Sequence, residues 1–262
     1  MTSKTPSLGK RALAVAFTAG FWPYLMGSSI VLFFPALGLF LATVAFDPKR
    51  RLLSKFTAEW GAHYLERAPF AGVEVTGREH VNAGPAIYVA NHQSMSDTLA
   101  LFSVRAEALW VSKVENFYAP FLGWNMLLNG FIPLKRGKLP SIMKMYRTCL
   151  KRLAEGHSLV VFPEGTRSED GNLRSFFRGA FALSTRAKVP IVPVVSAGGQ
   201  ETALFLSRGE GLARLIGADR LFRLKVLPIS LALPWGLNIG DFAGHIPLPA
   251  KITVEALAPI DL

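Results

Sequence analysis

The hydrophobic and polar positions predict an apolar N-terminal segment followed by a region of alternating strands and helices. No charged residue occurs between positions 12 and 46, a run longer than the roughly 20 residues that one helix needs to cross a bilayer. Pro23 and Pro35 interrupt this run, and basic residues flank both of its ends. Because positive charge stays on the cytoplasmic side, this symmetry predicts a membrane-associated helical hairpin or re-entrant pair. A signal peptide is the alternative, but its apolar region usually covers only about 7–15 residues.

Beyond Arg51, short apolar runs alternate with amphipathic stretches. We predict helices at 51–68 and 140–155, the second from apolar positions three and four residues apart that end at Gly156. This alternation predicts an α/β fold, a mostly parallel sheet flanked by helices whose ligands gather beyond the carboxyl ends of the strands. We therefore divide the chain into a membrane-anchoring segment, 1–50, and one α/β domain, 51–262. Strands are expected at 73–76, 86–90, 108–112, 158–162, 191–195, 225–229 and 252–256.

Composition narrows the classes of partner. The 262 residues are 50% hydrophobic, enough for one large domain core. The formal charge of +11 calls for an anionic partner: nucleic acid, an acidic carrier protein, a phosphorylated substrate or an anionic membrane. The concentration of apolar residues near the N-terminus favours the membrane. The single Cys149 excludes an intramolecular disulfide and argues against a Cys-based zinc site, which fits a domain facing the cytoplasm.

His92 and Asp97 form the first polar cluster. A spacing of five residues turns a helix through about 500°, so the two side chains cannot share a helical face. If 86–90 is a strand, His92 lies in the loop beyond it and Asp97 lies in the first turn of the next helix, where negative charge is favoured. There the carboxylate can hold one ring nitrogen and leave the other as a base. An isolated histidine would more simply be structural.

A second polar cluster, 162–168, follows another apolar run. It contains a carboxylate at Glu164, a backbone amide free of side-chain bulk at Gly165 and a guanidinium at Arg167. A guanidinium fork matches the geometry of phosphate, so the loop fits a phosphorylated alcohol. A solvated turn is the simpler alternative. The two clusters together predict a catalytic site.

Four blocks in a fixed order carry a resemblance to a known family. They are Asn-His-Gln-Ser-Met-Ser-Asp at 91–97, Gly-Phe-Ile-Pro-Leu-Lys-Arg at 130–136, Phe-Pro-Glu-Gly-Thr-Arg-Ser at 162–168 and Val-Pro-Ile-Val-Pro-Val at 189–194. With them the sequence resembles the glycerolipid acyltransferase family over roughly 72–199. One departure concerns Lys135, which stands before Arg136 where the family often has an acidic residue.

The resemblance implies an O-acyltransferase on the cytoplasmic face of the inner membrane. Such an enzyme moves a fatty acyl group from acyl-CoA or acyl carrier protein to the hydroxyl of a lysophospholipid. We expect 1-acylglycerol-3-phosphate as acceptor and phosphatidic acid as product, with neither a cofactor nor a metal. The domain 51–262 would then be the acyltransferase domain, and no activated serine is required.

The resemblance also implies roles for individual residues. His92 would be the general base, and Asp97 would fix its tautomer. Arg167 and Lys113 would hold the acceptor phosphate, although a solvated lysine is the alternative for Lys113. Glu164 would orient the glycerol or support the arginine, and a backbone amide near Gly165 would stabilise the oxyanion. The complete set of expected substrate-binding residues is Lys113, Arg136, Glu164, Gly165, Thr166 and Arg167.

Two alternatives remain at this stage. The acceptor is open, because the blocks describe the chemistry better than the head group; another lysolipid, an aminolipid or a glycolipid would also fit. A basic membrane scaffold or nucleic-acid-binding protein would use the +11 charge, but the basic residues are dispersed and no nucleic-acid motif occurs. The expected partners are therefore an anionic bilayer surface, the lysophospholipid and the acyl thioester, without nucleic acid. The apolar tail, 229–240, fits the bilayer, an acyl channel or the core.

Overall fold

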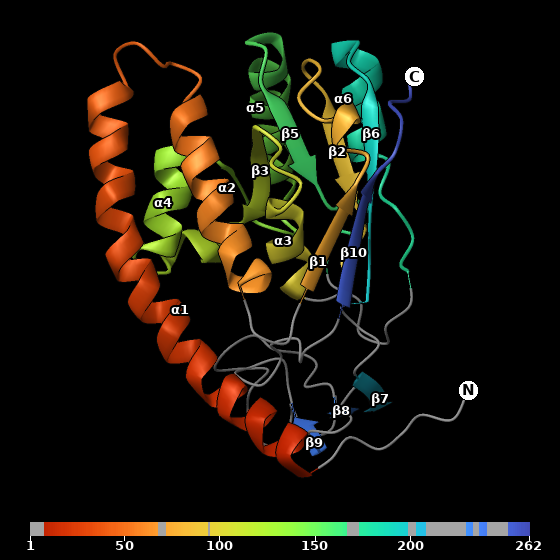
Figure 1. Cartoon of the computed structure of the whole chain (residues 1–262). Coiled ribbons are helices and arrows are strands. Elements are labelled where there is room, and N and C mark those ends of the chain that lie inside the picture. Colours follow the sequence, from red (N-terminus) through yellow and green to blue (C-terminus); the bar gives the residue numbers. More distant parts are fainter. Residues whose placement is uncertain are drawn as a thin grey trace.

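The computed structural model describes residues 8–67, 72–93, 95–166, 173–198, 203–207, 229–232, 236–239 and 251–262. A seven-stranded sheet forms its centre (Figure 1). In spatial order the strands are β1 (Gly72–Thr76), β10 (Lys251–Ala256), β6 (Ile191–Ala197), β2 (Ile87–Ala90), β5 (Ser158–Val161), β3 (Ala108–Lys113) and β4 (Ile132–Leu134).

The strands from β6 to β4 are parallel, whereas β10 runs antiparallel to β6 and parallel to β1. The predicted mostly parallel sheet is therefore confirmed. A second, antiparallel sheet consists of β7 (Ala203–Ser207), β8 (Ile229–Ala232) and β9 (Gly236–Ile239). Of the strand expected at 225–229, positions 225–228 lie outside the described residues, and β8 begins at Ile229.

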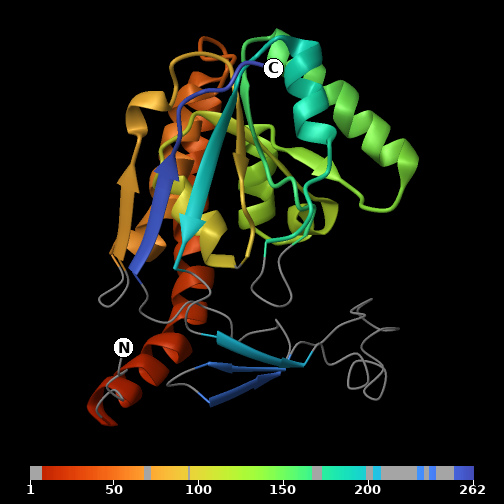
Figure 2. The same ribbon diagram turned by 90° about the vertical axis from the view of Figure 1, so that its right-hand side faces the viewer.

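Helices cover both faces of the sheet. Figure 2 shows α5 and α6 together on one face, where Cys149 and Leu183 pack against Ile87 and Leu159. The other face carries α2 and α3, whose Leu65 and Ala100 pack into a second cluster with the sheet. The helices are α1 (Leu8–Thr43), α2 (Arg51–Glu66), α3 (Met95–Phe102), α4 (Leu122–Asn129), α5 (Leu139–Ala154) and α6 (Gly179–Ala187), with short 3₁₀ turns η1 (Arg78–His80) and η2 (Val114–Tyr118).

The expected N-terminal hairpin is wrong in one respect, because α1 is one continuous helix through Pro23 and Pro35. An interior proline costs a helix about 3 kcal/mol. The cost is offset by packing: Leu25, Phe33 and Ala36 form one buried stripe of α1 against α2 and α4. The antiparallel partner of α1 is α2, which follows after a short turn (Figure 1). Within the described part of the chain, one segment, 23–43 of α1, is long and apolar enough to cross a membrane.

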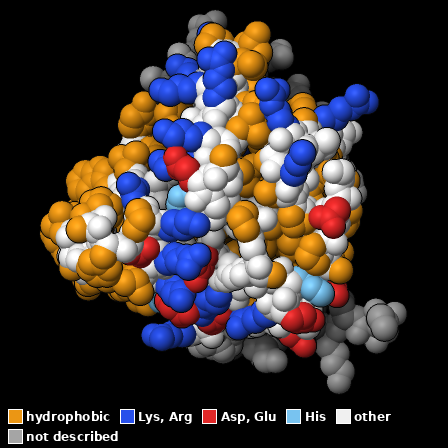
Figure 3. Space-filling view, turned by 90° about the horizontal axis from the view of Figure 1, so that it is seen from above, with side chains coloured by type: hydrophobic (Ala, Val, Ile, Leu, Met, Phe, Trp, Pro, Cys, Tyr) orange, Lys and Arg blue, Asp and Glu red, His pale blue; other side chains and the backbone are white. Residues whose placement is uncertain are grey.

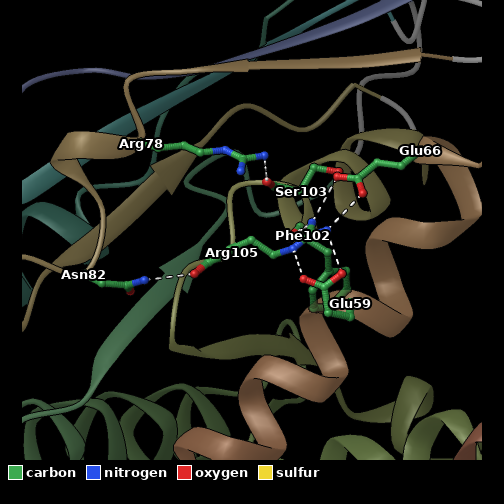
Figure 4. A network of polar contacts seen from close by, with 7 residues as sticks. All are labelled: Glu59, Glu66, Arg78, Asn82, Phe102, Ser103 and Arg105. Carbon is green, nitrogen blue, oxygen red and sulfur yellow. Dashed lines mark hydrogen bonds and ion pairs between the residues drawn. The ribbon is translucent and has the colours of Figure 1, made fainter.

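Arg105 ties α2 to the loop before β3 (Figure 4). Its guanidinium contacts Glu59 and Glu66 of α2, with Nη2 2.9 Å from Glu66 Oε2. Its carbonyl accepts a hydrogen bond of 2.9 Å from Asn82 Nδ2. Burial raises the pKa of Glu66, but the hydrogen bonds from Arg105 and Ser103 and the charge of Arg105 outweigh it, so the pKa is lowered. The network therefore fixes α2 against the segment between α3 and β3.

Candidate active site

Both polar clusters lie beyond the carboxyl ends of neighbouring parallel strands, at the lower edge of the sheet in Figure 1. β2 ends at Ala90, and His92 follows in the loop. β5 ends at Val161, and the loop that begins with Phe162 follows. Because β2 and β5 are hydrogen-bonded to each other, their two loops emerge side by side, as parallel strands require.

The His92 ring lies between an aromatic ring and a carboxylate. It stacks on Phe162 with 4.2 Å between ring centroids and 23° between ring planes. Its Nδ1 lies 3.9 Å from Asp97 Oδ2, and Asp97 occupies the first turn of α3, as predicted. This separation exceeds the usual hydrogen-bond length of about 2.7–3.2 Å. Such contacts often tighten only when substrate binds.

Asp97 is held at both carboxylate oxygens. Oδ2 accepts a hydrogen bond of 2.6 Å from the Gln93 amide, and Oδ1 accepts one of 3.0 Å from Ser196 Oγ. The side chains of Asp97 and Ser196 are buried. Because burial alone would favour the neutral acid, these two donors stabilise the charged form.

Asn91 extends the pairing of β2 with β6 by one residue. Its Nδ2 donates to the Ser196 carbonyl and its Oδ1 accepts from the Ser196 amide, each at 2.8 Å. The side-chain amide thus makes the two bonds that a backbone partner would make in a ladder. This pairing keeps the loop that carries His92 in register with β6.

Glu164 connects the loop that carries His92 to the segment before α6. Its Oε1 accepts a hydrogen bond of 2.7 Å from the His92 amide, and its Oε2 accepts one of 3.1 Å from the Arg174 amide. The residue is only 2% exposed. A buried carboxylate that accepts two backbone N–H groups fixes the relative positions of the segments that supply them.

Gly165 has a conformation that favours glycine. Its φ is +69°, and a Cβ at this position would lie 2.8 Å from the Phe177 ring. The Gly165 amide donates to the Phe162 carbonyl at 3.1 Å, and the Phe177 amide donates to the Pro163 carbonyl at 2.8 Å. The loop is therefore a tight turn covered by an aromatic side chain.

The remaining predicted site residues lie farther along the edge. Lys113 ends β3, two strands from β2, and its half-exposed ammonium lies 3.8 Å from Glu115. Arg136 is exposed in the turn after the edge strand β4. Thr166 is the last described residue of its loop, and Arg167 lies outside the described residues. The structure thus brings Glu164 to His92 and Asp97, and it sets Lys113 and Arg136 apart from them.

Three residues of this site have contacts that were not predicted: Asn91 and Phe162, which lie in the two predicted clusters, and Ser196, which lies outside both. One signal for Ser196 exists in the sequence, because Val192, Val194 and Ser196 alternate onto the same buried face of β6. A hydroxyl at a buried strand position needs a polar partner. The identity of that partner, 99 residues earlier in the chain, is not a local property.

Comparison with known proteins agrees with this geometry. A family model described as Acyltransferase matches residues 72–197. A 1-acyl-sn-glycerol-3-phosphate acyltransferase from Pseudomonas aeruginosa is 31% identical over 68% of this chain and 70% of its own. Two others, from Chlamydomonas reinhardtii and the chloroplast of Arabidopsis thaliana, are 37% and 38% identical over 71% and 58% of this chain. The chain spans about half the length of these two relatives, 55% and 43%.

The fold is also that of a solved structure. The crystal structure of the 1-acyl-sn-glycerophosphate (LPA) acyltransferase, PlsC, from Thermotoga maritima matches with a TM-score of 0.62, covering 96% of this chain and 87% of that one at 22% identity. The ordered blocks, the Pseudomonas relative and the shared fold lead to one conclusion. The chain belongs to the acyltransferase family that includes the 1-acyl-sn-glycerol-3-phosphate acyltransferases.

Proposed function

We propose that this protein transfers a fatty acyl group from an acyl thioester to the free hydroxyl of 1-acylglycerol-3-phosphate, giving phosphatidic acid. The observation that carries the proposal is the bond between Glu164 and the His92 amide, which joins the histidine loop to the glycine-containing loop. It supports one reaction centre formed by both clusters. The choice of acceptor is supported by the relatives, which are named as 1-acyl-sn-glycerol-3-phosphate acyltransferases.

His92 acts as general base in this proposal. Asp97, near Nδ1, orients the ring and stabilises the imidazolium, which leaves Nε2 to remove the proton of the acceptor hydroxyl. The hydroxyl oxygen attacks the thioester carbon, and the carbonyl oxygen becomes an oxyanion. The intermediate then collapses, and the leaving thiolate takes the proton from His92. Stacking on Phe162 limits rotation of the ring between these two proton transfers.

The oxyanion needs a backbone donor. Because the Gly165 amide already donates to Phe162, we assign this role to the next amide, that of Thr166. Direct attack by the acceptor is also consistent with the single thiol. Cys149 is buried in α5, and burial raises its pKa to about 12, so it stays protonated.

The acceptor phosphate is the part of the proposal that depends on the basic residues. We propose that Arg167 and Lys113 bind it and that Arg136 contributes from the turn after β4. Glu164, with both oxygens engaged by backbone amides, positions the loop rather than the glycerol. Acyl-CoA and acyl carrier protein both supply the required thioester.

We also propose that residues 1–50 attach the domain 51–262 to the cytoplasmic face of the inner membrane. The outer face of α1 exposes large apolar side chains, among them Val31, Phe34 and Leu41. Neighbouring α4 adds Trp124 and Leu127, each more than 40% exposed. An anionic leaflet would attract nearby basic side chains by about 1 kcal/mol each.

A matrix of donors and acceptors tests the proposal. Purified protein in detergent is offered acyl-CoA or acyl carrier protein with each of several lysolipids, and product masses are recorded. We expect phosphatidic acid from 1-acylglycerol-3-phosphate at a rate at least tenfold above other head groups, because a site that pairs with a terminal phosphate disfavours acceptors in which that phosphate is esterified or absent. Equal rates with a neutral lysolipid would show that 1-acylglycerol-3-phosphate is not the preferred acceptor. No turnover with any donor and acceptor pair would refute acyl transfer.

A further inference from the structure

A cavity of about 140 Å³ opens at the amino-terminal edge of the sheet, one strand length from His92. The turn between α1 and α2 supplies Lys49, Arg50 and Arg51, and the start of β5 is preceded by His157. Figure 3 looks onto this face of the molecule and shows Lys and Arg side chains gathered across it. The cavity shares none of its lining residues with the catalytic loops.

The cationic side chains of this cavity are held by carbonyl oxygens. Lys49 Nζ donates to the Gly156 carbonyl at 3.3 Å, and Arg50 Nη1 donates to the Leu128 carbonyl at 2.6 Å. Within the residues that the structure describes, no carboxylate forms an ion pair with Lys49 or Arg50. These carbonyls lie at or just after the carboxyl ends of α4 and α5, whose dipoles supply only about half a negative charge each, so each cation keeps part of its charge.

The acidic residue of the cavity is shared. Glu107 lies 3.5 Å from Arg51 Nε and 3.3 Å from Lys55 Nζ. The Glu107 carboxylate thus pairs with two cations, whereas Lys49 and Arg50 have no carboxylate partner among the residues that the structure describes. The lining therefore carries an excess of positive charge, and an anion is its natural complement.

The directions in which the pKa values of Arg50 and His157 are shifted agree with this excess of positive charge. Burial and the charge of Arg152 lower the pKa of Arg50. Burial, followed by the charge of Arg152, lowers the pKa of His157, and Lys49 and Arg50 act in the same direction against the opposing effect of Glu155. The charged forms of Arg50 and His157 are thus disfavoured, first by burial and then by neighbouring cations. A bound anion would offset the second effect.

The size of the cavity restricts the ligand. Sites for drug-sized ligands usually occupy about 300–1,000 Å³, so this cavity suits a single small group. A planar guanidinium fork beside an ammonium matches the oxygens of phosphate. We propose that this cavity binds one phosphate group, separately from the acceptor phosphate of the reaction.

Two sources offer such a phosphate. One is free phosphate or a soluble phosphate ester. The other is the phosphate of an anionic lipid, because the same turn exposes Val44, Phe46 and Leu52 beside the basic residues. The binding chemistry is the same in both cases, so the test is designed to distinguish them.

The first arm measures thermal unfolding of the full chain in neutral detergent while phosphate replaces chloride at constant ionic strength. Wild type is compared with Lys49→Gln/Arg51→Gln and with a matched control, Lys144→Gln/Arg147→Gln, which removes the same charge from the exposed face of α5. Phosphate bound elsewhere acts equally on all three proteins. We expect saturable stabilisation of wild type and control, and about a tenfold or greater increase in the phosphate concentration that the cavity variant requires.

The second arm measures flotation with vesicles of phosphatidylcholine, with and without phosphatidylglycerol. Loss of the phosphatidylglycerol-dependent gain in the cavity variant, but not in the control, identifies a lipid phosphate. A change in the first arm alone identifies a soluble phosphate. If the cavity variant and the control behave alike in both arms, the proposal is overturned. Arg51→Gln alone, with a side chain 62% exposed, replaces the double variant if that protein fails to fold.

Discussion

Carboxylates at the two edges of the seven-stranded sheet differ in their burial and in their hydrogen-bond partners. At the carboxyl edge, Asp97 and Glu164 are buried and accept hydrogen bonds from backbone amides. At the amino edge, Glu107 is partly exposed and pairs with the long side chains of Arg51 and Lys55. Backbone donors have fixed positions, whereas Lys and Arg side chains lose rotamer entropy when they are fixed. The comparison indicates that rigidity is concentrated at the edge where the proposed chemistry needs it.

The largest expected effect comes from His92→Ala. The variant removes the proposed base while leaving Glu164 bonded to a backbone amide that the substitution retains. We expect acyl transfer to fall by about 10²–10⁴-fold, with an unfolding temperature close to that of wild type. Initial rates and circular dichroism measure the two properties. Turnover like that of wild type would remove His92 from the base role.

Glu164→Ala and Glu107→Ala compare the two edges directly. The first change removes a buried carboxylate and leaves two backbone amides without their acceptor, for a loss of about 2–4 kcal/mol in the free energy of unfolding. The second breaks the partly exposed ion pairs with Arg51 and Lys55, for about 0–1 kcal/mol. Urea unfolding of both variants measures the difference. Equal losses would mean that burial and backbone donors do not distinguish the edges.

Ser196→Ala tests the support of Asp97. The lost hydrogen bond goes to a buried carboxylate, so we expect activity to fall about tenfold and stability to fall by about 1–2 kcal/mol. Ser184→Ala is the matched control. Ser184 lies in α6, and its buried hydroxyl donates to the Val189 carbonyl at 2.6 Å. The control should lose similar stability and keep its activity. If both variants lost activity to the same extent, Ser196 would have a structural role only.

Arg105→Gln is expected to have a small effect that depends on pH. The pKa of Glu66 is lowered in the folded state relative to its usual 4.5, so its pairing adds stability above about pH 4.5 and loses it as pH falls through the lowered value. Wild type should exceed the variant by about 0.5–1 kcal/mol at pH 7, and the gap should narrow below pH 4.5. Unfolding midpoints across pH measure the gap. A gap that does not change with pH would assign the effect of Arg105 to packing.

The local pattern of apolar and polar residues predicted those helices and strands whose buried residues recur at regular spacing. The spacing of apolar residues predicted α5 at 140–155, and it occurs at Leu139–Ala154. The place of Asp97 in the first turn of a helix was likewise predicted and confirmed. In these cases a single periodic stripe determines which side faces the core, so neighbouring residues carry the information.

Features that depend on distant partners were not predicted. The continuity of α1 through Pro35 depends on its packing against α2 and α4, which overrides the local preference of proline to end a helix. β4 contains only three residues, too few for a periodic pattern. The role of Ser196 depends on Asp97, which lies in another element. The candidate site could be predicted from two loops, but the hydrogen bond from Ser196 that holds the Asp97 carboxylate could not.

The pairing of Asn91 with Ser196 also has a consequence for how the protein assembles during synthesis. The two residues are 105 positions apart, so a ribosome-bound chain that has released the first 170 residues carries His92, Asp97 and Glu164 but no β6. β6 lies between β2 and β10 and closes the centre of the sheet. Because pairings of such long sequence separation form late and slowly, the two loops of the candidate site gain their final order only after β6 has emerged, when most of the sheet exists.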